Sequence, residues 1–225
     1  MAPFADIYVA EVGPANERLK DKPLTEALNF AIAQEAKIVV MAFGWEKDEK
    51  NPQYPAFERS LEKIAKGSLP TLLFAAACNG GVEQRRTYPA IENSVFAIHA
   101  SDHEGKFRGY NPPPILGQKN YITIGDEVPG YDENSRESGT SFATVVAAAI
   151  AASIIEMMRR YGSQDDQWPL EYLQTYDGMS KVFQKMSKPR GDLYDYLDWP
   201  DLFSLHNTDE EICEEITRWL KDNKT

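Results

Sequence analysis

Ser138-Gly139-Thr140-Ser141-Phe142-Ala143-Thr144 runs directly into Val145-Val146-Ala147-Ala148-Ala149-Ile150-Ala151-Ala152, and the interpretation of the whole chain starts from this stretch. The Gly-Thr pair predicts a tight turn. The apolar run predicts a helix buried on every side, whose alanines let neighbouring backbones approach closely. Ser141 stands in the first helical turn, where its N–H lacks an intrahelical partner and the helix dipole favours negative charge. The position suits either a chemically active serine or a serine that only caps the helix.

The composition fits one sizeable core, or one core with a helical extension. The chain has 225 residues, of which 42% are hydrophobic and 11% aromatic. It carries 35 acidic against 24 basic residues, a formal net charge of −11, and its basic residues cluster only in pairs. Phosphate binding needs clustered Lys and Arg, so we expect no nucleic-acid partner.

Metal-binding, redox and targeting signals are absent from the sequence pattern. Cys78 and Cys213 are far apart and have neither disulfide-framework nor metal-ligand spacing. No carboxylate cluster has calcium-loop spacing, so we expect no metal and no cofactor. The start, Met1–Asp6, has no basic or long apolar region, which predicts no signal peptide and a cytoplasmic location by default. Ser153 and Glu156 interrupt the alanine-rich helix, so we expect no membrane span.

Strand and helix patterns alternate through the first half of the chain. Apolar spacing predicts helices over Leu24–Ala36 and about Phe57–Ala65. β-rich or continuously apolar runs predict strands at Ala5–Val12, Lys37–Phe43, Leu69–Ala77 and Val95–Ala100. This order predicts an α/β fold with a parallel sheet, right-handed crossovers and flanking helices.

The second half of the chain has a different character. Residues 107–137 predict a long loop with one strand at Tyr121–Ile124. After Gly162 the pattern predicts two short helices within Trp168–Met186, an aromatic-rich segment and an acidic helix over Asp209–Lys221. We therefore predict a main domain over residues 1–161 and a helical C-terminal extension over residues 162–225, which packs on that domain or forms an interaction surface.

Three stretches are expected at the carboxyl ends of the parallel strands, where α/β sheets bind ligands. The first is Ala42–Gly44, the second is Ala75–Gly80, and the third, through the helix, is Gly139–Ser141. Asn79 offers two uncharged N–H donors, and the Ser141 backbone N–H would join it in binding an oxyanion. The sequence thus predicts a shallow cleft lined by backbone and small residues.

These stretches resemble the subtilisin-like serine peptidases, the subtilase family. Gly139–Thr144 is similar to the nucleophile motif, Phe74–Asn79 to the oxyanion strand, and Val39–Gly44 to the substrate-pairing strand. Two further segments match in order: Tyr88-Pro89-Ala90 with Val95–Asp102, and Ala2–Tyr8, which resembles the stretch after the family's histidine helix. The matches cover Ala2 to Met158 and imply a three-layer subtilisin-like sheet.

The resemblance also implies residue roles. Ser141 would be the acylating nucleophile and Asn79 the oxyanion donor. A polypeptide substrate in extended conformation would pair with the chain as an added β-strand. The substrate-binding residues would be Phe43 and Gly44 in the pairing strand and Ala75, Ala76 and Ala77 along the P1 pocket.

The sequence departs from the family pattern in several places. Cys78 replaces the customary glycine before the asparagine, which would crowd the P1 pocket; Val145 and Ala149 stand where proline and glycine are usual. The family's Asp and His motifs would lie upstream of Ala2–Tyr8, so we expect the fold to be N-terminally incomplete. His99, His103 and His206 match no base motif, and a serine without a base is a weak nucleophile.

Three functions stay open at this point. The first is a serine endopeptidase whose N-terminal part is missing from this chain, leaving it inactive alone. The second is a degenerate peptidase fold that binds peptides or partners without cleaving them, as a module of a larger host protein. The third is a non-enzymatic α/β interaction domain in which Ser141 only caps its helix.

Overall fold

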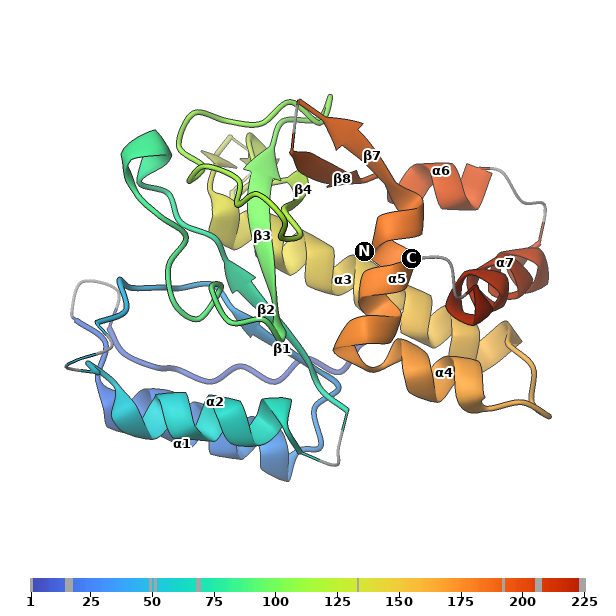
Figure 1. Cartoon of the computed structure of the whole chain (residues 1–225), viewed down its shortest axis with the longest axis horizontal. Helices are drawn as coiled ribbons and strands as arrows, with labels where there is room; N and C mark the ends of the chain where they lie inside the picture. The colour runs from blue at the N-terminus through green and yellow to red at the C-terminus, as the bar shows by residue number, and fades with distance from the viewer. Residues whose placement is uncertain are drawn as a thin grey trace.

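A six-stranded sheet in the order β1-β2-β3-β4-β8-β7 forms the centre of the computed structural model (Figure 1). The structure describes residues 2–14, 18–48, 50, 52–67, 70–132, 134–191, 193–204 and 208–222. Adjacent strands pair in parallel except at the edge, where β7 is antiparallel to β8. The strands are β1 (Ile38–Met41), β2 (Leu72–Ala76), β3 (Val95–Ser101), β4 (Tyr121–Ile124), β7 (Ser187–Arg190) and β8 (Tyr194–Leu197).

Helices cover both faces of this sheet, which confirms the predicted three-layer α/β class. On one face α1 (Asp21–Ala33) and α2 (Pro55–Ala65) pack on the first three strands. On the other face lies α3 (Thr140–Tyr161), joined by α5 (Tyr176–Met186). The remaining helical segments are η1 (Gly81–Glu83), α4 (Trp168–Leu173), α6 (Trp199–Ser204) and α7 (Asp209–Lys221).

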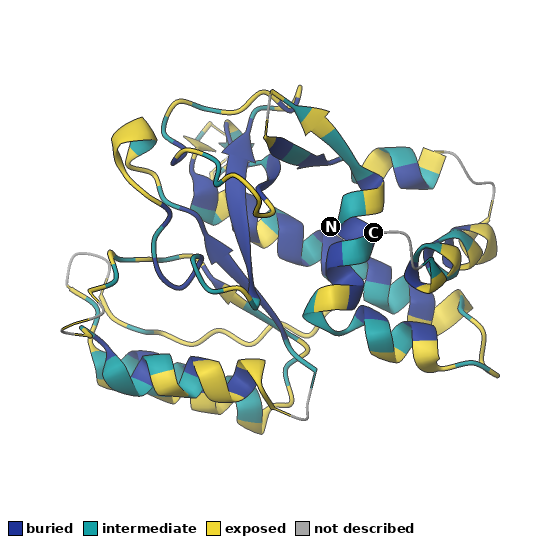
Figure 2. Cartoon of the chain, viewed as in Figure 1, coloured by how far each residue is buried: buried dark blue, intermediate teal, exposed yellow. Residues whose placement is uncertain are grey.

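The continuous apolar character of the inner strands follows from burial on both faces. Along β2, Leu73 and Ala75 point into the core under α1 and α2, whereas Leu72 and Phe74 point into the core with α3 and α5. Side chains alternate between the two faces of a strand, so both sets must be apolar. Figure 2 shows β2 and β3 as buried throughout.

Helix α3 packs on one face of the sheet and is the central helix of the core. The helix has 22 residues, and an 18-residue window within it has a mean hydropathy of 1.9, so it is long and apolar enough to span a membrane by length and composition alone. In the structure Ala147, Ile150 and Ile154 pack into the larger core instead. The prediction that the helix is buried on every side is wrong, because Phe142 and Val145 are exposed on a flank that no described element covers.

The predicted strand at Ala5–Val12 is also wrong. Residues 2–14 have no strand, and Ile7 and Val9 are 81% and 86% exposed. The segment touches the body through Tyr8, whose ring packs edge-on against Phe30 of α1. β-prone residues form a strand only where another strand satisfies their backbone groups, and none of the described strands pairs with this segment.

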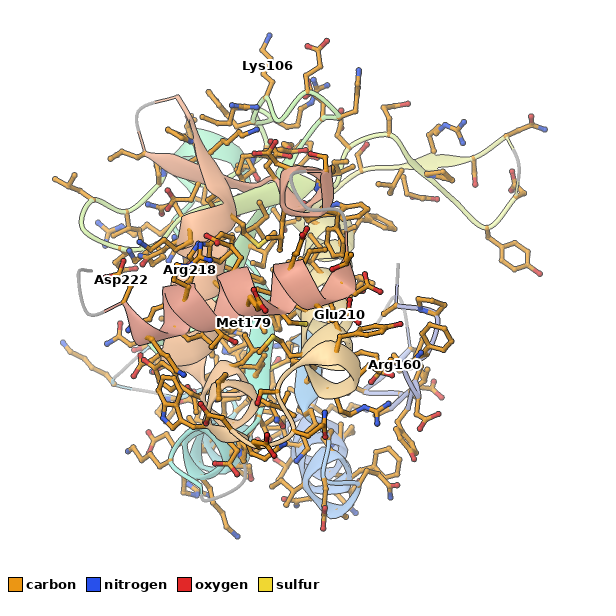
Figure 3. All side chains as sticks on the ribbon, turned by 90° about the vertical axis from the view of Figure 1, so that its right-hand side faces the viewer. Lys106, Arg160, Met179, Glu210, Arg218 and Asp222 are labelled. Atoms are coloured by element: carbon orange, nitrogen blue, oxygen red, sulfur yellow. The ribbon has the colours of Figure 1, made fainter. Side chains whose placement is uncertain are left out.

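Residues 162–225 do more than add helices. Within this predicted helical extension, β8 pairs in parallel with β4, and β7 closes the hairpin at the sheet edge. Helix α7 packs over α5 and α3, and Figure 3 looks onto it, with Glu210 and Arg218 on the helix and Met179 of α5 beside it. The segment therefore contributes to the central sheet and to the same apolar core as α3.

Candidate active site

Ser141 lies at the carboxyl edge of the sheet as the second residue of α3. The N-cap is Gly139, and no side chain of the N-cap bonds the helix. The half-buried Ser141 hydroxyl donates to the carbonyl of Ala42, just after β1, at 3.1 Å. The interpretation of Ser141 as a helix cap is therefore wrong, because a cap accepts from helix N–H groups.

Asn79 takes over the capping that Ser141 does not perform. Its Oδ1 accepts from the Thr140 backbone N–H at 2.9 Å and from the Thr140 hydroxyl at 3.0 Å. A backbone N–H can only donate, so the amide oxygen must face Thr140. The Asn79 Nδ2 then lies on the Gly139 side, where a Cβ placed on Gly139 would be 3.2 Å from it.

The two predicted catalytic residues thus meet at one turn. Asn79 bonds the residue next to Ser141, and no partner for the Ser141 N–H is found among the described residues. An unpaired N–H at a helix start and a nearby amide NH₂ are both uncharged donors suited to a developing oxyanion.

Two glycines allow this turn to form. Gly139 has a φ of 153° and donates its N–H to Gly125, which follows β4, at 2.7 Å. A Cβ on Gly125 would lie 2.7 Å from that of Ala143 and 2.8 Å from the Gly139 carbonyl. Any larger residue at Gly125 would push the start of α3 away from the sheet.

A polar cluster that the sequence analysis did not predict contacts this turn at Gly125 and Asp126. The Tyr110 hydroxyl lies 3.4 Å from the Gly125 carbonyl and 3.5 Å from a carboxylate oxygen of Asp126. Arg108 binds the buried Asp126 at 3.0 Å. Burial, reinforced by the Asp126 charge, raises the pKa of Tyr110 to about 12, so the phenol stays protonated. The only signal in the sequence was Gly125-Asp126 directly after a predicted strand.

The predicted substrate-pairing residues have mixed exposure. Gly44 is exposed, whereas Phe43 is half-buried and packs against Trp45 and Phe57. Two backbone hydrogen bonds of 3.0 and 2.9 Å join Trp45 to Tyr88, fixing the segment on one side. Any pairing with a peptide would therefore use backbone groups of Phe43 and Gly44, not the Phe43 ring.

The predicted P1-pocket residues are covered in this structure. Ala75 and Ala77 are fully buried and Ala76 is 5% exposed. The next residue, Cys78, is half-buried with a φ of 156°, a conformation that favours glycine. Its thiol lies 3.0 Å from Gln84 Oε1. Of residues 75–78, only Cys78 is partly accessible, and the roles of the three alanines stay a prediction.

No described histidine contacts Ser141. His99 is fully buried in β3, with Nδ1 3.1 Å from the Tyr121 carbonyl. Burial, with a smaller effect of the Arg86 charge, lowers its pKa to about 3, so it stays neutral. His103 is exposed in the following turn, and His206 lies outside the described residues. In the described part of the chain, no three His, Cys, Asp or Glu side chains converge as metal ligands.

A mostly parallel sheet between two layers of helices, with a serine at the start of a core helix and an amide side chain beside it, is the arrangement of a serine-peptidase fold. The model of the subtilase family matches residues 1–175. The chain belongs to the subtilase family.

Several known proteases are similar to this chain. The minor extracellular protease Epr of Bacillus subtilis (strain 168) is 29% identical over 164 residues, 68% of this chain and 23% of Epr. The solved prenylagaramide maturation protease PagA has a TM-score of 0.65 at 20% identity, over 92% of this chain and 71% of PagA. A mutant of the protease domain of PatA has a TM-score of 0.68 at 21% identity, over 84% of this chain and 66% of that domain. The chain spans about a quarter of its curated relative.

Proposed function

We propose that this chain carries the nucleophile and the oxyanion donors of a serine endopeptidase that cleaves extended polypeptides. The observation that carries the proposal is the meeting of Asn79 and Ser141 at one turn, where the Ser141 N–H has no partner among the described residues. Ser141 Oγ would attack the peptide carbonyl and form an ester as the amine leaves. Asn79 Nδ2 and the Ser141 N–H would stabilise the oxyanion.

The proton of Ser141 needs an acceptor in this reaction. In the structure the hydroxyl donates to the Ala42 carbonyl, which accepts a hydrogen bond but is no base at neutral pH. The described histidines lie elsewhere. We infer that the base comes from an upstream segment or a host protein, and that these 225 residues alone turn over peptides slowly or not at all.

The peptidase-like part is proposed to be residues 1–161, with residues 162–225 as an extension packed tightly against it. The pairing of β8 with β4 and the shared core support folding of the two parts as one body. Loss of the extension is then expected to expose the β4 edge of the sheet.

A second candidate function is peptide binding without cleavage. It is favoured by the same hydrogen bond, since a Ser141 hydroxyl held by Ala42 with no described base nearby is poorly activated. Exposed Gly44 would still offer backbone groups to an extended peptide.

Labelling with a fluorophosphonate separates the two functions. Imidazole added in solution supplies the proton acceptor, so we expect slow labelling of Ser141 that rises with imidazole concentration, mapped by peptide mass spectrometry. Ser141→Ala should abolish that label. Two results would leave only the binding function. The first is that Ser141→Ala is labelled as strongly as the unaltered chain, at other residues. The second is that the chain binds peptide but Ser141 is not labelled at any imidazole concentration.

A further inference from the structure

A cavity of about 210 Å³ lies beside the first residues of β3, away from the carboxyl edge that holds Ser141. Strand β4 pairs with β3 only from Ile98 onward. The first three residues of β3, Val95–Ala97, therefore extend past the start of β4, and the cavity fills the space beside them. Arg86, Gln118, Lys119 and Tyr176 are among the residues that line it.

Arg86 is the group in this cavity that calls for an explanation. The side chain is only 7% exposed, and its Nε–H is buried without a partner among the described residues. The guanidinium donates to Gln118 Oε1 at 3.1 Å, to Asn120 Oδ1 at 2.6 Å and to the Lys119 carbonyl at 3.4 Å. All three acceptors are neutral oxygens. Within the described ranges, no carboxylate lies within ion-pair distance of Arg86.

A buried cation without a counterion is costly, because neutral acceptors replace only part of its hydration. Burial lowers the pKa of Arg86 to about 10, so the group still carries its charge at neutral pH. Lys119 adds a second cation at the cavity rim. The one carboxylate on the wall, Glu92, is taken up by an ion pair with Lys47 at 2.6 Å.

We propose that this cavity is a binding site for a small oxyanion, a phosphate or carboxylate group, held by the Arg86 guanidinium and assisted by Lys119. The Arg86 guanidinium lines the cavity and supplies charge-assisted hydrogen bonds, which an oxyanion accepts better than water does. The site is locally positive on a chain whose net charge is −11. The cavity is lined by residues of the loop after β2, the loop before β4 and the start of α5. A bound anion would therefore hold these three segments together.

The test is thermal unfolding of the chain in phosphate, succinate or chloride at matched ionic strength, with calorimetric titration of the anion that responds. A ligand that binds only the folded state raises Tm in a saturable way. We expect phosphate or succinate, or both, to raise Tm above the chloride value. Tm values that coincide in all three salts would overturn the proposal.

Variants assign the response to the cavity. Arg86→Gln should weaken binding by about tenfold or more, whereas Arg85→Gln, which removes the same charge from an exposed neighbour, should not. If Arg86→Gln fails to fold, Lys119→Gln serves, with the exposed Lys106→Gln as its control (Figure 3). Anion binding that survives both cavity variants would contradict the site.

The sharpest variant is Gln118→Glu, because it keeps the side-chain shape and puts a carboxylate where Oε1 already bonds Arg86. The new counterion from residue 118 should raise Tm in chloride and remove the response to phosphate and succinate. An unchanged anion response in Gln118→Glu would show that Arg86 does not bind the ion. None of these readouts depends on peptide hydrolysis, so they hold whether or not Ser141 is a nucleophile.

Discussion

Asn79 Oδ1 accepts the backbone N–H of Thr140 at 2.9 Å and thereby joins the end of β2 to the first turn of α3. The loop after β2 and the start of α3 are 61 residues apart in the chain. One side chain thus has two tasks at its two ends. Its oxygen satisfies the helix start, and its NH₂ group is available for the proposed oxyanion role.

Two substitutions at Asn79 separate these tasks. Asn79→Asp keeps the acceptor for Thr140 and adds charge at a helix N-terminus, so stability should change little. It removes the N–H donors, so imidazole-assisted phosphonylation of Ser141 should fall by about 10²–10³-fold. Asn79→Ala loses both tasks, and its unfolding free energy should also drop by about 1 kcal/mol. Denaturant unfolding measures the stability of both variants, and the rate of fluorophosphonate labelling measures the donor role. Equal labelling by Asn79→Asp and the unaltered chain would contradict the donor role.

The sequence predicts the turn at Ser141 and Asn79 because local patterns determine both ends. The apolar run of α3 and the buried strand before Asn79 are strong signals, and parallel strands bring their carboxyl ends to one edge. The partners that these side chains contact are harder to predict from the sequence. Ala42 takes part through its carbonyl alone, and no side-chain pattern announces a backbone acceptor.

The elements that sequence reasoning missed depend on distant partners. Ser187–Arg190 contains Lys188 and Pro189 and has no β pattern, and it becomes a strand only because β8 pairs with it. Ala5–Val12 shows the opposite case, since its β-prone residues find no described strand partner, form no strand, and leave Ile7 and Val9 exposed. Strand formation is decided by tertiary pairing more than by intrinsic preference.

Asn111 is predicted to be a structural residue of high cost. Its buried side chain accepts the Ala100 N–H at 2.8 Å and donates to the Ala100 carbonyl at 2.7 Å, standing in for a neighbouring strand. Asn111→Ala leaves both backbone groups unpaired, so the unfolding free energy should fall by about 2–4 kcal/mol in denaturant titration. The exposed Asn134→Ala is the matched control and should change it by less than about 0.5 kcal/mol. A similar small change for Asn111→Ala would contradict the pairing.

The two cysteines should react at very different rates with iodoacetamide. Cys78 is half-buried next to Asn79, whereas Cys213 is 3% exposed, and burial raises the pKa of Cys213 to about 11. The thiolate is the reactive form, so the native chain should be alkylated at Cys78 and spared at Cys213, as intact-mass and peptide mapping would record. The added group beside Asn79 should also slow labelling of Ser141. Cys78→Ser, which has no thiol at this position, is the control, and iodoacetamide should not slow its Ser141 labelling. Faster modification of Cys213 would contradict the burial.

His99 should make the fold sensitive to acid. Burial, then the Arg86 charge, lowers its pKa from 6.5 to about 3, and the Tyr194 ring packs against it. Between these values the unfolded chain binds a proton that the folded chain does not, so stability falls as pH drops from about 6 to 3, by up to about 1.4 kcal/mol per pH unit. His99→Gln should flatten this slope, measured by denaturant unfolding at several pH values, whereas the exposed His103→Gln should keep it. Parallel slopes for His99→Gln and the unaltered chain would mean that the carboxylates alone cause the acid sensitivity.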